Sequence, residues 1–292
     1  MSVAESADGP TRFNARMALA RRNALLLAAT QAIAGSASPI SISLGGLAGF
    51  YLLGADKSLA TAPVTGFNVG VAAGALPAAW LMRQVGRRYG FMTGAASLAL
   101  GGLIAAIALF RSDFILFIVG LVIIGMGAAF TQQYRFAAAD GAPTSFKASA
   151  ISWVLAGGVF AAIIGPQTVI YTRELFAPVS FAGSFLAILP LAALATLILA
   201  FLKIPQDTVV GDEDHDDRPA RPLLTVISQR RFITAMICGI GTYALMSFMM
   251  TGAPLAMVGC GFSPNLATLG IQWHVMAMFA PSFITCRLIR RF

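Results

Sequence analysis

The feature that most constrains this chain is a series of eight apolar blocks, each 20 to 30 residues long. A helix needs about 20 apolar residues to cross the hydrocarbon core of a bilayer, so every block is long enough to span one. The blocks are continuous and do not alternate as barrel strands would, which favours helices. The predicted spans are Ala24–Leu53, Leu59–Met82, Phe91–Phe110, Phe114–Ala139, Ala148–Tyr171, Val179–Leu202, Phe232–Val258 and Leu266–Leu288.

Composition agrees with this pattern. Hydrophobic residues make up 58% of the chain and charged residues 11%, with a mean hydropathy of +0.79. Ordinary globular domains are about 45–50% apolar and about 25% charged. This imbalance excludes a soluble enzyme, a secreted disulfide scaffold, a disordered chain and a fibrous protein, because too few polar side chains remain to cover a water-exposed surface. We therefore expect an all-α integral membrane protein with the lipid bilayer as its surroundings.

The net charge of +8 does not indicate nucleic acid as a partner. The basic residues form short clusters between apolar blocks, which is typical of membrane proteins. With the N-terminus inside, the outer loops hold only Lys57, Arg111 and Arg173, and each of these has an acidic neighbour. The positive-inside rule then predicts a multi-pass protein of the cell (inner) membrane with a cytoplasmic N-terminus.

The chain divides at its longest polar segment. We expect a cytoplasmic N-terminal tail over 1–23, a six-helix bundle over 24–202, a cytoplasmic linker over 203–231, and two helices of an incomplete second bundle over 232–292. The linker carries His215 among five acidic residues, and a solvated, flexible segment explains it without a metal. A short match in residue type between 79–85 and 286–292, each after the second span of its unit, favours a repeated unit.

Three patches resemble the major facilitator superfamily (MFS) of secondary transporters. Residues 79–90 are similar to the family's signature loop between helices two and three, matching at Leu81, Gly86, Arg87 and Arg88, while Ala79 and Arg83 stand where the family usually has a Gly and an Asp. The second patch is 134–140 at the end of the fourth span, and the third is Gly165-Pro166 in the fifth, which looks like the antiporter motif of that helix.

The resemblance implies two six-helix halves with the substrate bound between them near the membrane midplane. This chain would then hold one six-helix half and the first two helices of the other. We expect a truncated form or a fragment.

The resemblance also places the signature loop beside the inner end of the fourth span. Asp140 lies at a helix C-terminus, where the helix dipole disfavours a carboxylate, so a nearby guanidinium would stabilise it. We expect Arg87 to pair with Asp140 as a latch that holds the outward-facing state closed on the cytoplasmic side. Gly86 and Arg88 belong to the same gating loop, although Arg88 fits simple membrane anchoring as well.

Polar residues inside the spans are candidates for the substrate cavity. Arg135 lies well inside a span and shares a helical face with Gln132, although snorkelling to the cytoplasm would also explain this Arg. An amide needs two or more hydrogen-bond partners in a dry environment, and His can titrate near neutral pH, although packing explains such residues too. The predicted cavity residues are Gln31, Asn68, Gln132, Arg135, Gln167 and His274.

The preferred function is alternating-access transport of a small solute, with efflux favoured over metabolite uptake by Gly165 and Pro166. A truncated, non-transporting membrane protein remains an alternative. An intramembrane enzyme is disfavoured, because the spans offer one His and no acid for catalysis. The absence of Asp and Glu from the spans leaves a coupling proton open. We expect no metal and no cofactor, and the oligomeric state stays open.

Overall fold

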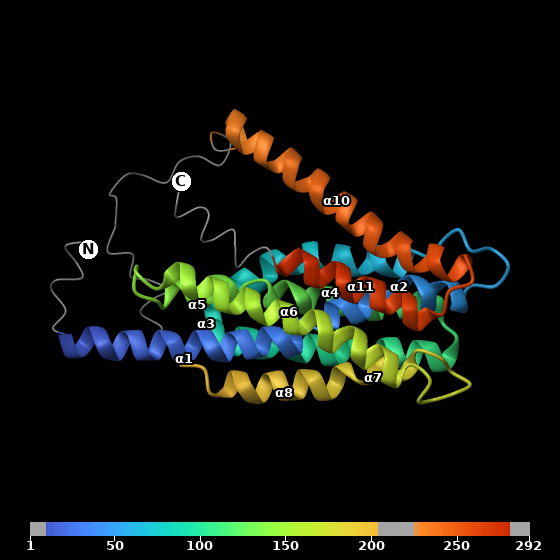
Figure 1. Cartoon of the computed structure of the whole chain (residues 1–292), viewed down its shortest axis with the longest axis horizontal. Coiled ribbons are helices and arrows are strands. Elements are labelled where there is room, and N and C mark those ends of the chain that lie inside the picture. Colours follow the sequence, from blue (N-terminus) through green and yellow to red (C-terminus); the bar gives the residue numbers. More distant parts are fainter. Residues whose placement is uncertain (1–9, 204–224, 226, 281–292) are drawn as a thin grey trace.

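The structure is a computed structural model that describes residues 10–203, 225 and 227–280. The first part of the chain forms α1 (Pro10–Ala34), α2 (Ala37–Leu52), α3 (Ala62–Arg111), α4 (Phe114–Thr131), α5 (Tyr134–Asp140), α6 (Lys147–Thr172), α7 (Ala182–Leu186) and α8 (Ile188–Ala200). After the segment 204–224 come α10 (Arg230–Gly259) and α11 (Pro264–Phe279). The long helices lie roughly side by side, and the connections lie at the two ends of the bundle (Figure 1).

The first predicted span is longer than expected and is broken in the middle. Helix α1 begins at Pro10, inside the predicted tail, and the break to α2 falls at Gly35 and Ser36. A Cβ on Gly35 would lie 2.2 Å from the carbonyl oxygen of Gln31, so only glycine fits this bend. The bend brings backbone and side-chain polar groups to the middle of the bundle.

Helix α3 contains two of the predicted spans, folded back on each other at Gly86. Gly86 has φ 82° and ψ 160°, a conformation open to glycine and strained for other residues. After the turn, a Cβ on Gly90 would lie only 3.4 Å from the Cα of Met82, so the two arms start close together. The short loop expected at Gly86 is therefore a one-residue reversal.

Both arms of α3 pack along α4 through glycines. In the first arm, Cβ atoms at Gly66, Gly70 and Gly74 would meet residues of α4 at positions 118, 122 and 126 in turn, so this arm runs parallel to α4. In the second arm, Gly94 and Gly101 meet α4 in the opposite order, at 130 and 124. Small residues let membrane helices approach closely, so these glycines set the helix spacing.

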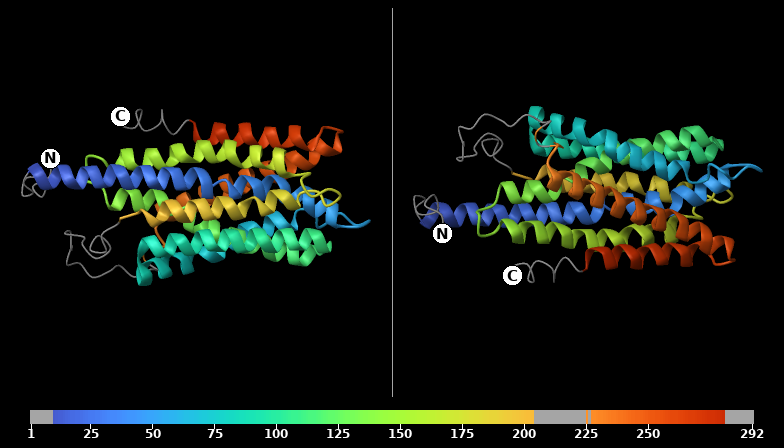
Figure 2. Two further views of the ribbon diagram at one scale, coloured as in Figure 1. Left: turned by 90° about the horizontal axis from the view of Figure 1, so that it is seen from below. Right: turned by 90° about the horizontal axis from the view of Figure 1, so that it is seen from above.

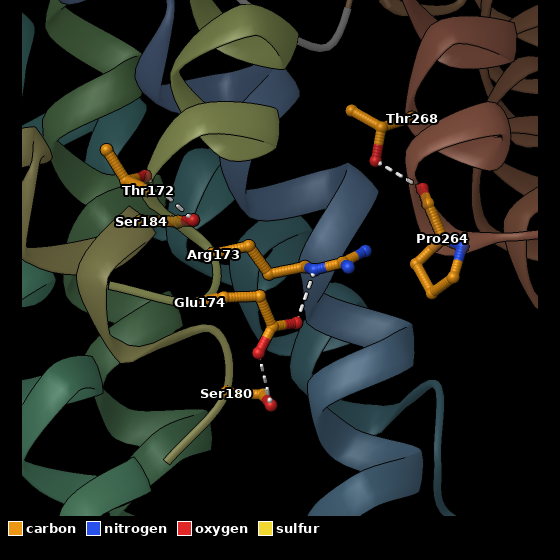
Figure 3. A network of polar contacts seen from close by, with 7 residues as sticks. All are labelled: Thr172, Arg173, Glu174, Ser180, Ser184, Pro264 and Thr268. Atoms are coloured by element: carbon orange, nitrogen blue, oxygen red, sulfur yellow. Dashed lines mark hydrogen bonds and ion pairs between the residues drawn. The ribbon is translucent and has the colours of Figure 1, made fainter. Parts of the chain in front are cut away.

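The ends of the bundle are joined by side-chain contacts. Arg22 and Asn23 of α1 donate to the carbonyls of Phe201 and Lys203 at 3.0 and 2.7 Å, fixing α1 to the end of α8. At the opposite end, Thr172 donates to Ser184 at 3.1 Å, and the Arg173 Nε–H donates to Glu174 at 2.8 Å (Figure 3). We call these ends the Gly86 end and the Lys57 end, after the loop residue that each contains.

Helices α10 and α11 lie on one side of this bundle. Helix α11 packs on α6, while the arms of α3 and α4 lie on the far side (Figure 2). Helix α10 contacts α2 toward its Gly259 end and diverges toward Arg230 (Figure 1), where every residue from 230 to 245 is exposed. Helices α10 and α11 therefore contact the bundle mainly toward the Lys57 end.

Six stretches of the described residues are long and apolar enough to cross a membrane. One is the 50-residue α3, which contains two predicted spans, and the 16 described residues of α11 fall short of the required length. These two facts account for the difference from the eight predicted spans. The arrangement is all-helical over the described residues, and the division into six helices plus two stays a prediction.

Candidate functional site

A central cavity of about 190 Å³ lies where the broken helices meet α10 and α11. The break between α1 and α2 lines one wall with Gln31, Gly35 and Ser38, and the end of α4 adds Thr131 and Gln132. The remaining lining is mostly apolar: Pro39, Ile42, Phe67, Val71, Ala128, Gly158, Ala161, Ala162, Tyr243, Met246, Met250, Val275, Met278 and Phe279. A mostly apolar cavity with a few polar groups is typical of a small-molecule site.

Two of the predicted cavity residues line this cavity together. The side-chain nitrogen of Gln31 lies over Gly35, where an added Cβ would come within 2.7 Å of it. Gln132 ends α4 as its C-cap residue and is exposed to the cavity space. The structure therefore brings two carboxamides to one cavity, each able to donate and accept hydrogen bonds.

Asn68 lies beside the cavity and uses its amide in contacts with α10. Its Nδ2 donates to Ser247 Oγ at 3.1 Å, and the hydroxyl of Tyr243 donates to its Oδ1 at 3.4 Å. Because the ring of Tyr243 lines the cavity, Asn68 positions a cavity residue and joins α3 to α10.

Gln167 also joins two helices. Its Nε2 donates to the Oε1 of buried Gln272 at 2.8 Å, which connects α6 to α11. Neither amide is among the residues that line the cavity. In the described part of the chain, this hydrogen bond and those of Asn68 are the ones in which a side-chain amide joins α10 or α11 to the preceding helices.

Arg135 and His274 lie outside the cavity. Both are exposed, and the Arg135 guanidinium lies 4.8 Å from the ring centroid of Phe136. Their predicted contact with substrate stays a prediction. Gly165 and Pro166 are buried where α6 crosses the α1–α2 break, since a Cβ on Gly165 would meet Pro39 and the Ser36 carbonyl at 2.8 Å. These two residues help shape the wall beneath the cavity.

The signature loop contacts the end of α5. Arg87 Nη2 donates to Asp140 Oδ2 in an ion pair, with side chains 21% and 47% exposed. The pair joins α3 to α5, both within the first six predicted spans. It is formed in a structure in which the Arg230 end of α10 does not pack against the bundle and is exposed. Arg88 lies 5.7 Å from the ring of Tyr89, and its Nε is buried without a partner among the described residues. The role of the pair as a latch stays a prediction.

Comparison with known proteins gives a consistent result. Residues 22–292 match the family model of the Major Facilitator Superfamily. The chain belongs to this superfamily. It is 50% identical to the riboflavin transporter RfnT of Brucella anthropi over 94% of this chain and 68% of that protein.

More distant relatives agree with this assignment. The uncharacterized MFS-type transporter YdeG of Bacillus subtilis is 28% identical over 94% of this chain and 66% of its own length. The crystal structure of a D-xylose-proton symporter has a TM-score of 0.62 at 13% identity, covering 94% of this chain and 68% of that one. The chain thus spans about two thirds of the length of these proteins. As a family member it is a multi-pass membrane transporter and not an enzyme.

The sequence analysis predicted none of the apolar residues that line the central cavity. Phe67, Tyr243 and Phe279 carry rings, and three methionines of α10 and α11 add flexible side chains. In a sequence where apolar residues fill every span, nothing separates a lining Met from a lipid-facing one. The available sequence signal was the small and amide residues that interrupt the apolar blocks at Gly35–Ser36 and Gln132–Gln133. The helices break at both places.

Metal binding has no structural support in the described ranges, where no group of three or more His, Cys, Asp or Glu side chains could hold an ion. Cys238 and Cys260 are exposed and unpaired there, and residues 215 and 286 lie outside the described residues.

Proposed function

We propose that the protein carries riboflavin, or a flavin closely related to it, across a bacterial inner membrane by alternating access. The observation that carries this proposal is the 50% identity to a riboflavin transporter over 94% of the chain. The similarity extends over most of the chain, which supports a related substrate.

The cavity has the chemistry that a flavin ring requires. The isoalloxazine ring is planar and uncharged, and its pyrimidinedione edge presents an N–H donor between two carbonyl acceptors. Gln31 and Gln132 supply complementary amide groups, and the rings of Phe67 and Phe279 supply apolar surfaces for stacking. A cavity of about 190 Å³ accommodates part of the ring system, and the ribityl chain would extend through its open side.

The decisive experiment measures riboflavin transport by its fluorescence in proteoliposomes. We expect Gln31→Leu and Gln132→Leu each to raise KM by about tenfold, because an unpaired polar group of the ring then costs about 1–3 kcal/mol. Gln84→Leu serves as the control, since Gln84 is exposed on α3 and outside the cavity. Wild-type protein that moves no flavin in either direction would refute the proposal.

Direction and orientation belong to the same proposal. Gly165 and Pro166 favour export, with import as the alternative, and growth of a riboflavin auxotroph on external riboflavin would reveal import. We infer that the Gly86 end faces the cytoplasm, because the loops at the Lys57 end hold few basic residues. Labelling by an impermeant maleimide in intact cells, with Cys238, Cys260 and Cys286 replaced by Ser, tests this: Leu175→Cys should react and Gln84→Cys should not.

A further inference from the structure

A second cavity of about 190 Å³ lies at the Gly86 end, outside the central site. Its walls come from both arms of α3 and from α5. Polar groups of Arg83, Arg87 and Gln133 line it, together with the apolar side chains of Ala79, Met82, Phe91, Phe136 and Ala137. Nothing in alternating access itself requires this cavity.

The polar side chains of this cavity have donor groups that no described residue satisfies. Arg87 uses its Nη2 on Asp140, but its Nη1 is buried without a hydrogen bond among the described residues. Arg83 is exposed and Gln133 is half-buried, and neither side chain has a hydrogen-bond or ion-pair partner within residues 10–203, 225 and 227–280. Guanidinium groups only donate, so a ligand that satisfies them must offer several acceptor oxygens.

The net charge of the cavity restricts the class of ligand further. Asp140 offsets Arg87, which leaves the charge of Arg83 uncompensated at the cavity. Arg135 adds positive charge nearby, because its guanidinium lies over the ring of Phe136, which lines the cavity. A phosphodiester monoanion complements two guanidinium groups and one amide in both charge and hydrogen-bonding capacity.

The surroundings of the cavity are amphipathic. Leu76, Trp80 and Arg83 share one face of the first arm of α3, at spacings of four and three residues. Leu76 is 82% exposed and Trp80 is 63% exposed, so an apolar stripe runs from the cavity toward the middle of the span. Trp is enriched at the headgroup level of membranes, and the stripe offers acyl chains a continuous surface.

We propose that this cavity binds an anionic phospholipid, with its phosphodiester on Arg83, the free Nη1 of Arg87 and Gln133, and an acyl chain along Trp80 and Leu76. The ion pair of Arg87 with Asp140 stays intact when the lipid binds, because the two contacts use different nitrogens of the guanidinium. The donor groups fit a phosphate, and the apolar stripe favours a phospholipid over free phosphate.

The test titrates the purified, detergent-solubilised protein with dioctanoyl phosphatidylglycerol and follows binding by native mass spectrometry and by thermal shift. We expect one tightly retained lipid. Arg83→Gln should weaken its binding at least fivefold, and Gln133→Leu should weaken it about threefold. Arg111→Gln is the matched control, because it removes the same charge from an exposed site at the Lys57 end, and it should change binding less than twofold.

Three outcomes would overturn the proposal. Equal binding of dioctanoyl phosphatidylcholine would show that net charge is not recognised. An equal loss in Arg83→Gln and Arg111→Gln would show unspecific attraction to a basic protein. Displacement of the lipid by millimolar inorganic phosphate, or the same thermal shift from phosphate alone, would assign the cavity to a free anion. Gln133→Leu keeps the test decisive if Arg83→Gln does not fold, since it leaves the charge unchanged.

Discussion

The side-chain amide of Gln167 on α6 donates a 2.8 Å hydrogen bond to Gln272 on α11. Gln167 lies five residues before the end of α6 at Thr172, so this bond is near the Lys57 end. Asn68 joins α3 to α10 in the same half of the bundle. Toward the Gly86 end, by contrast, α10 is exposed from 230 to 245. Among the described helices, contact therefore closes the Lys57 end and leaves the Gly86 end open.

Gln167→Leu should favour opening at the Lys57 end. A side-chain hydrogen bond between membrane helices contributes about 0.6 kcal/mol on average, which changes a two-state population about threefold. Spin labels at the exposed positions Leu175 and Phe262 would report this as a larger fraction of long distances. Gln84→Leu should leave the distances unchanged, and unchanged distances in Gln167→Leu would remove Gln167 as a gate residue.

Asp140→Asn tests the predicted latch at the Gly86 end. The pair with Arg87 is partly exposed, so we expect a loss of at most about 1 kcal/mol in stability. A latch that holds the Gly86 end closed would also require a shift toward states open at that end, whereas in this structure the pair is formed while the Gly86 end is open. Distance measurements across that end would show the shift, and the exchange Arg87→Asp with Asp140→Arg should partly reverse it. If the single variant loses stability without any change in distances, the pair only fastens α5 to α3.

Tyr243 is expected to act on substrate through its ring more than through its hydroxyl. Tyr243→Phe keeps the ring in the cavity and loses the bond to Asn68. KM for riboflavin should then change less than threefold, whereas Tyr243→Ala should raise it at least tenfold, because an apolar contact surface is lost. Equal effects of the two substitutions on KM would indicate that the hydroxyl itself contacts the substrate.

The sequence predicts the membrane-spanning helices well, because a bilayer strongly constrains the chain that crosses it. A span must bury its backbone polar groups in a helix, so apolar blocks of sufficient length predict the helices and their approximate ends. The break at Gly35–Ser36 is not predicted by hydropathy, because a bent helix keeps the same apolar content as a straight one. The start of α1 at Pro10 was missed because the polar residues that begin this helix give no hydropathy signal.

The candidate site was predicted less completely than the fold. Gln132 was singled out because it shares a helical face with Arg135, and Gln31 because an isolated amide in an apolar block needs partners; both line the cavity. The same argument selected Asn68 and Gln167, but their partners Ser247 and Gln272 depend on the register between helices far apart in the sequence. A single sequence does not contain that register. The proximity of Arg87 and Asp140 came from the family resemblance, which supplies the arrangement of the loops.

Gly70→Ala should destabilise the bundle, because α3 and α4 touch at this position. A Cβ there would lie 2.1 Å from the carbonyl oxygen of Val122, so the helices must move apart. Overpacking of this kind typically costs about 1–3 kcal/mol, and a lower melting temperature in detergent would report it. Gly252→Ala is the matched control, since nothing lies within 4 Å of a Cβ on this α10 glycine. Because the clash in Gly70→Ala is with backbone, adding Val122→Ala should not restore stability. Restored stability in that double variant would mean that the two helices are separated by side chains and not by direct backbone contact.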